Sequence, residues 1–117
     1  MNFNFDVDKV VSAMVQASAS ALIKGGKQAT EYATHEYAGF IADIEHVQTM
    51  AEEGTITKVE AQALVEQHKL SMQAVLVAIE GLSLIAVQNA INAALKVLKE
   101  ALSGALGGAV KGLKFGL

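Results

Sequence analysis

The stretch EEGTITKVE, residues 52–60, carries two helix-end signals. Gly54 is typical of the residue just past a helix C-terminus, because glycine adopts the left-handed conformation there without strain. Thr57 and Glu60 have the Thr-x-x-Glu spacing of a capping box, in which each residue satisfies a free N–H group at a helix N-terminus. The stretch therefore predicts a turn between two helices.

The segments before this turn have the periodicity of helices. The chain has 117 residues, of which 52% are hydrophobic and none is proline, so it suits one domain with a modest core. A first segment begins at Asp6, a predicted N-cap, and ends at the glycine pair 25–26. Its predicted apolar stripe, with alternating spacings of three and four, is Val7, Val10, Met14, Ala17 and Ala21. The second segment carries one apolar stripe with alternating spacings of three and four, namely Ala33, Tyr37, Phe40, Ile44, Val47 and Ala51. These patterns predict an all-α fold.

After the turn, a third segment holds one heptad-like seam over most of its length. The seam consists of Ala63, Gln67, Leu70, Ala74, Val77, Gly81, Leu84, Gln88, Ile91, Leu95, Leu98 and Leu102. Between Ser71 and Leu95, apolar residues appear on nearly all sides of the predicted helix, not only on the seam. This pattern predicts that the helix is buried on all sides. Gln67 and Gln88 are polar positions within the seam, and we expect them to fix the register or the oligomeric state.

Folding the chain at this turn pairs residues 7–53 with residues 57–103. The glycine pair 25–26 then lies opposite Leu84, about one helical turn from Gly81. Two architectures satisfy this pairing. The chain forms a long antiparallel helical hairpin that dimerises along its length, or it bends at the glycines into a four-helix bundle. The apolar third segment favours association, because one neighbouring helix cannot cover all of its sides.

Residues 104–117 form a Gly-rich tail that we separate from the helical domain of residues 1–103. Its glycines recur at every fourth position, at Gly104, Gly108, Gly112 and Gly116. This spacing is typical of close helix–helix contact, so we expect the tail to contribute to oligomerisation. Leucines together with Lys111 and Lys114 support an alternative, in which residues 101–117 lie on a membrane surface.

The histidines predict two alternative sites. His35 and His46 share one side of the second segment, with the small residues Ala38, Gly39 and Ala42 between them. A haem group would lie on such a surface, with His35 as an axial ligand and Gly39 leaving room for the ring. The competing interpretation is that another helix packs against these small residues.

The second predicted site is a metal site. Asp43 and His46 are three residues apart on one helix, and the hairpin places Asp43 level with His68. Two imidazoles and one carboxylate form a ligand set that suits a divalent metal such as iron or zinc. The competing interpretation is a buried polar layer without a metal.

Composition argues against several functional classes. All basic residues are lysine and the net charge is −3, which disfavours nucleic-acid binding. No catalytic motif is present, so we expect no enzymatic activity. Asp6 and Asp8 stand where a secretory signal would be basic and apolar, which indicates a cytoplasmic protein by default. The sequence thus predicts a homo-oligomer or partner-docking protein, with a membrane-associated protein and a haem- or metal-binding bundle as the alternatives.

Overall fold

The structure is a computed structural model that describes residues 5–106, with side chains described as far as Ser103. Its elements are α1 (Val7–Leu22), the single-turn 3-10 helix η1 (Ile23–Gly25), α2 (Gly26–Glu52), α3 (Lys58–Val77) and α4 (Leu84–Leu106). Residues 5–106 contain no strand. The all-α prediction is confirmed.

The helix ends follow the local chemistry of the sequence. The Asp6 carboxylate accepts a hydrogen bond from the Lys9 N–H at 3.3 Å and caps α1. Thr57 and Glu60 form both bonds of the capping box that opens α3, at 2.9 and 3.1 Å. Gly54 follows α2 with a φ of 74°, in the left-handed region. The predicted turn between α2 and α3 is therefore confirmed.

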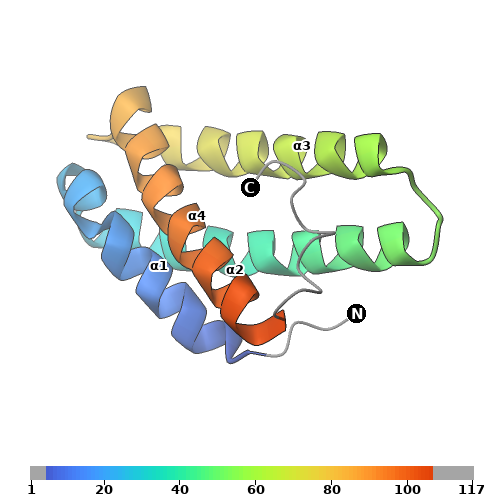
Figure 1. The fold of residues 1–117 in the computed structure, drawn as a ribbon. Helices are drawn as coiled ribbons and strands as arrows, with labels where there is room; N and C mark the ends of the chain where they lie inside the picture. The colour runs from blue at the N-terminus through green and yellow to red at the C-terminus, as the bar shows by residue number, and fades with distance from the viewer. Residues whose placement is uncertain (1–4, 107–117) are drawn as a thin grey trace.

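Two antiparallel helix pairs build the molecule (Figure 1). Helices α2 and α3 run side by side, joined by the turn that contains Gly54. Helix α1 packs most extensively against α4, and it also contacts α2. Helix α3 contacts α2 along its length but touches α4 only slightly, so it lies at the edge of the bundle. Of the two predicted architectures, the chain adopts the four-helix bundle.

The chain bends where the glycines of its two arms meet. Gly81 has a φ of 92°, and a Cβ atom at this position would lie 2.5 Å from the carbonyl oxygen of Lys24. A Cβ atom on Gly25 would lie 3.1 Å from the Leu82 side chain. The predicted proximity of the glycine pair 25–26 to Gly81 is therefore confirmed. The prediction of one seam running unbroken through the third segment is wrong, because residues 78–83 end α3 and turn the chain before α4.

The core follows the predicted stripe closely on α2 and less closely on α1. Tyr37, Phe40, Ile44 and Val47 are buried, as the spacing predicted. On α4, the buried side chains include the last four residues of the predicted seam, Ile91, Leu95, Leu98 and Leu102. On α1 the buried side chains are Val11, Met14, Ser18 and Leu22, so the core face is rotated from the predicted stripe. Helix α4 continues beyond residue 103, so the predicted domain boundary falls inside a helix.

Candidate functional site

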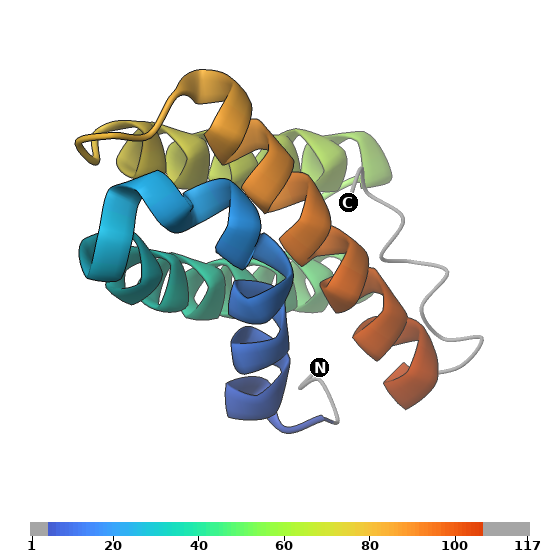
Figure 2. The same ribbon diagram turned by 90° about the vertical axis from the view of Figure 1, so that its left-hand side faces the viewer.

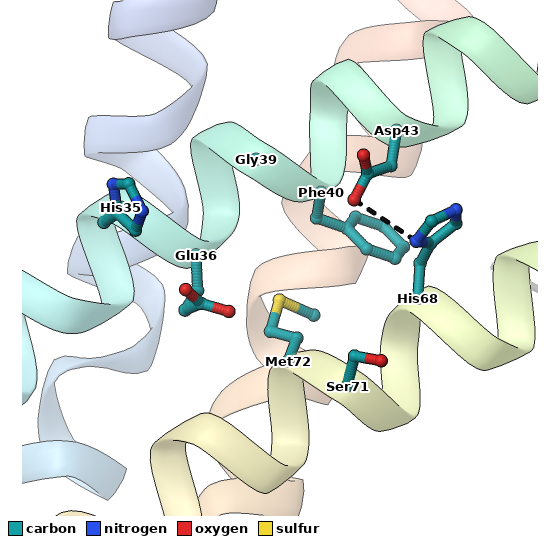
Figure 3. Close-up of a pocket in the computed structure, with 8 residues that line it drawn as sticks. All are labelled: His35, Glu36, Gly39, Phe40, Asp43, His68, Ser71 and Met72. Atoms are coloured by element: carbon teal, nitrogen blue, oxygen red, sulfur yellow. Dashed lines mark ion pairs between the residues drawn. The ribbon is translucent and has the colours of Figure 1, made fainter.

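A shallow groove of about 190 Å³ lies between α2 and α3 and gathers the predicted site residues (Figure 3). Its lining residues are His35, Glu36, Gly39, Phe40, Asp43, His68, Ser71 and Met72. His35 and the Asp43–His68 pair lie toward opposite ends, and the buried side chains of Phe40 and Met72 lie between them. The groove thus brings together residues that the sequence assigned to two separate sites.

The hairpin geometry correctly predicted that Asp43 and His68 are neighbours. The Asp43 Oδ2 atom lies 3.3 Å from His68 Nδ1, an ion pair when the imidazole is protonated. His46 is exposed and does not line the groove. Nowhere in residues 5–106 do three or more His, Cys, Asp or Glu side chains lie close enough together to hold a metal ion. The predicted ligand set of Asp43, His46 and His68 is therefore not assembled, because His46 projects from a different side of α2.

The groove is small for a haem group. Pockets that hold drug-sized ligands and cofactors usually measure about 300–1,000 Å³, above the volume found here. His35 is exposed, and a Cβ atom on Gly39 would meet nothing within 4 Å. No described helix therefore packs closely on Gly39, whereas Ala38 is half-buried and packs against the core. Haem binding through His35 and Gly39 stays a prediction.

The Asp43–His68 pair is partly open to solvent. A carboxylate on Nδ1 orients an imidazole for proton transfer through Nε2. Both side chains are partly open to solvent, with 33% of His68 and 49% of Asp43 exposed, so water screens their interaction. Ser71 lines the same groove, on the α3 side next to His68. The pair is a polar contact between α2 and α3.

A buried polar contact that sequence reasoning missed joins α1, α2 and α4. The Ser18 Oγ atom lies 2.7 Å from the Tyr37 hydroxyl, 2.8 Å from the Met14 carbonyl oxygen and 3.0 Å from the Ala90 carbonyl oxygen. Carbonyl oxygens only accept, so the Ser18 proton points to them and the Tyr37 hydroxyl donates to Ser18. Burial raises the pKa of the Tyr37 hydroxyl, because desolvation disfavours the phenolate.

Helix α3 has two apolar faces, and only one of them is buried. The inner face packs on α2 and contains the buried residues Ala61, Val65, Met72 and Leu76. The opposite face, here called the outer face of α3, consists of Val59, Ala63, Gln67, Leu70, Ala74 and Val77. All six are exposed, including 52% of Leu70 and 37% of Val77. The first half of the predicted seam therefore faces solvent in the single chain, so the predicted burial of this segment on all sides is not reached within one chain.

Gln67 and Gln88 do not form a buried layer within the chain. Gln67 lies on the outer face of α3, and Gln88 is exposed on α4, beyond the break at Gly81. Because the helix ends between them, the two side chains no longer belong to one continuous seam. A role for either residue in oligomerisation stays a prediction.

The tail lies largely outside the described residues. Gly104 falls in the last turn of α4, whereas Gly108 and Gly112 lie beyond residue 106. Oligomerisation through these glycines and membrane contact through residues 101–117 both stay predictions. Within residues 5–106, no helix has the length and hydropathy needed to cross a bilayer.

The outer face of α3 is thus a regular apolar surface that the packing of the single chain leaves uncovered. Comparison of the chain with protein-family models, with curated proteins and with solved structures found no match.

Proposed function

We propose that this chain is a non-enzymatic helical protein that self-associates through the outer face of α3. The observation that supports this proposal is the pair of apolar faces on opposite sides of α3, of which only the inner one is buried. A helix at the edge of a bundle needs one apolar face and usually exposes a charged one. A second apolar face contributes to stability only when another segment or molecule removes it from water.

The outer face differs from ordinary surface hydrophobic residues in its regularity. Single exposed apolar side chains are common and need no explanation. Here six positions on one face carry no charge from Val59 to Val77. Ala63, Leu70 and Val77 recur at intervals of seven residues, the repeat that fits a second helix packed alongside. The pattern therefore favours a helix as the binding partner.

A second copy of α3 fits this face. Leu70 lies midway between Ala63 and Val77, so two antiparallel α3 helices related by a two-fold axis place each alanine opposite the partner's valine. A small side chain then faces a larger one in both layers, which allows the side chains to interdigitate. Leu70 lies near the axis, at the centre of the interface, where truncation usually has the largest effect on affinity.

The experiment introduces charges into the outer face with residues that have good helix propensity. In the outer-face variant, Leu70→Glu and Ala74→Lys place a Glu–Lys pair at positions i and i+4, which supports an isolated helix. The control variant places the same pair on the exposed side of α1 with Ser12→Glu and Gln16→Lys. We expect the dissociation constant of self-association to rise at least about tenfold in the outer-face variant and to stay unchanged in the control.

Two outcomes would contradict the proposal. One is an unchanged dissociation constant in the outer-face variant with intact helicity, measured by sedimentation velocity and circular dichroism. The other is an outer-face variant that no longer floats with anionic liposomes but keeps the wild-type mass in solution. That result would show that the outer face binds a lipid surface instead of a second copy.

A further inference from the structure

The side of α2 that faces α1 continues beyond the start of α1. Thr30, Thr34 and Ala38 of α2 line a hollow that this helix forms with α1. Helical spacings of three and four extend the same line from Ala38 through Ile41, Glu45, Gln48 and Glu52. Helix α1 has 16 residues and α2 has 27, so the last turns of α2 extend beyond the start of α1. The second half of this stripe is therefore not covered by α1.

Gln48, on this half of the stripe, has a buried side-chain oxygen without a donor. Only 4% of the residue is exposed, and its Nε2 atom donates a hydrogen bond to the Glu52 carboxylate at 2.9 Å. That bond fixes the orientation of the amide, because the reverse orientation would place the amide oxygen against the carboxylate oxygen. No described residue donates to Gln48 Oε1. Buried polar atoms are nearly always paired, so this acceptor calls for a donor from outside the described residues.

Two carboxylates flank the buried acceptor. Glu45 lies three residues before Gln48 and Glu52 lies four residues after it, so all three share one side of α2. Glu45 is half-buried, and charges that are partly buried are screened by salt less than exposed ones. The site therefore favours a segment that brings hydrogen-bond donors together with positive charge.

The segment that follows α4 has these properties and begins close to the site. Figure 2 shows the red end of α4 and the blue start of α1 at the same end of their helix pair, on the side of α2 that faces away from α3, as Figure 1 also does. Residues 107–117 lie outside the described residues, and they contain Lys111 and Lys114 but no acidic residue. Lys111 follows Leu106 by five residues, which span at most about 17 Å when extended. This reach exceeds the usual distance of about 8–10 Å between the axes of packed helices.

We propose that residues 107–117 fold back onto the C-terminal half of α2 as an intramolecular strap. The strap donates a hydrogen bond to Gln48 Oε1, and its two lysines pair with Glu45 and Glu52. While it is bound, the tail is held away from contacts with other copies or with a membrane. Salt releases the strap, because ions in solution screen its ion pairs. This docking goes beyond self-association through the outer face of α3 and does not depend on it.

Paramagnetic relaxation in the full-length chain tests the contact. The chain has no cysteine, so Gly112→Cys provides a single site for a nitroxide label. We expect the amide signals of residues 45–52 to lose most of their intensity and those of residues 26–33, at the other end of α2, to keep theirs. An equimolar mixture of isotope-labelled wild-type chain and nitroxide-carrying chain without isotope reports contacts between copies. We expect no loss of intensity in this mixture.

Charge reversal distinguishes a bound strap from a tail that is only close to α2. Lys111→Glu with Lys114→Glu brings like charges to the two glutamates of the stripe, so we expect the signals of residues 45–52 to recover most of their intensity. The matched control is Lys96→Glu with Lys99→Glu, which reverses two exposed lysines of α4 at the same spacing. We expect the control to leave the loss of intensity unchanged.

Three results would overturn this inference. One is full signal intensity over residues 45–52 in the nitroxide-labelled chain. Another is an equal loss of intensity in the mixture, which would show that the tail of a second copy covers α2. The third is an equal response of the two charge-reversal variants. Failure of the outer-face proposal is distinguishable, because it would appear in the mass in solution and would leave the loss of intensity within the labelled chain in place.

Discussion

The hydroxyl oxygens of Ser18 and Tyr37 lie 2.7 Å apart in a site that is closed to solvent, and this contact ties α1 to α2. Ser18 also hydrogen-bonds the Ala90 carbonyl oxygen of α4. Three helices therefore share one polar contact within a largely apolar interior. Such a point specifies one arrangement of the helices, because any other packing would leave buried hydroxyl groups unpaired.

The two hydroxyls should be strongly coupled in their effect on stability. In Ser18→Ala the Tyr37 hydroxyl loses its acceptor while still buried, and we expect a loss of about 1–3 kcal/mol. In Tyr37→Phe the Ser18 hydroxyl keeps its carbonyl acceptors, so the loss should be smaller, about 0.5–1.5 kcal/mol. The double variant should be no less stable than Ser18→Ala alone. Urea unfolding of all four proteins measures the coupling, and additive losses would show that the hydroxyls act independently.

Tyr37 should also make the fold sensitive to alkaline pH. Its pKa is raised in the folded protein, so the unfolded chain loses the phenolic proton first. Stability from this group is fully present below the usual tyrosine pKa of about 10 and is lost as the pH rises through the folded value. We expect Tyr37→Phe to flatten the decline in stability at pH values above about 10. If the stability of wild type and of Tyr37→Phe declined in parallel with rising pH, Tyr37 would be excluded as the cause of the alkaline loss of stability.

The glycines at positions 81 and 39 should respond to alanine in opposite directions. Gly81→Ala introduces a Cβ atom 2.5 Å from the Lys24 carbonyl oxygen at a φ of 92°, and we expect a loss of at least about 2 kcal/mol. Gly39→Ala fills open space within α2 and should gain about 0.5–1 kcal/mol from helix propensity. Thermal unfolding compares the two variants. Equal effects would show that the meeting of Gly81 with Lys24 does not constrain the fold.

Local signals explain why the hairpin could be predicted from the sequence. Gly54, Thr57 and Glu60 determine the turn through hydrogen bonds within a few residues, and those bonds are independent of the rest of the fold. The proximity of Asp43 to His68 could be predicted from that turn by counting residues along the two antiparallel helices. The direction in which His46 projects did not follow from counting, because it depends on how α2 is rotated about its axis.

The outer face of α3 shows what periodicity cannot decide. The helix carries one stripe through Leu70 and another through Met72, and both have helical spacing. The sequence analysis assigned the more regular stripe to the interior, whereas the structure buries the other one. Spacing identifies apolar stripes, but the choice of the buried one depends on the neighbouring helices. The contact of Ser18 with Tyr37 was missed for a similar reason, because a serine within a helix carries no signal of a distant partner.

Gln67 and Gln88 provide a test of whether the outer face of α3 ends at the break before α4. Gln67→Leu removes the polar residue from that face, so we expect tighter self-association and a broader range of oligomeric states. Gln88→Leu lies beyond the break on α4 and should leave the oligomeric state unchanged. Size-exclusion chromatography with light scattering reports both. A matching response of the two variants would indicate that one interface spans both helices.

The mass of the wild-type protein in solution tests the central claim most directly. Multi-angle light scattering over a range of concentrations up to high micromolar should give a dimer or a larger assembly, because the outer face of α3 would otherwise leave Leu70 and Val77 in water. A single species with the 12.2 kDa mass of one chain at the highest concentration would contradict the account.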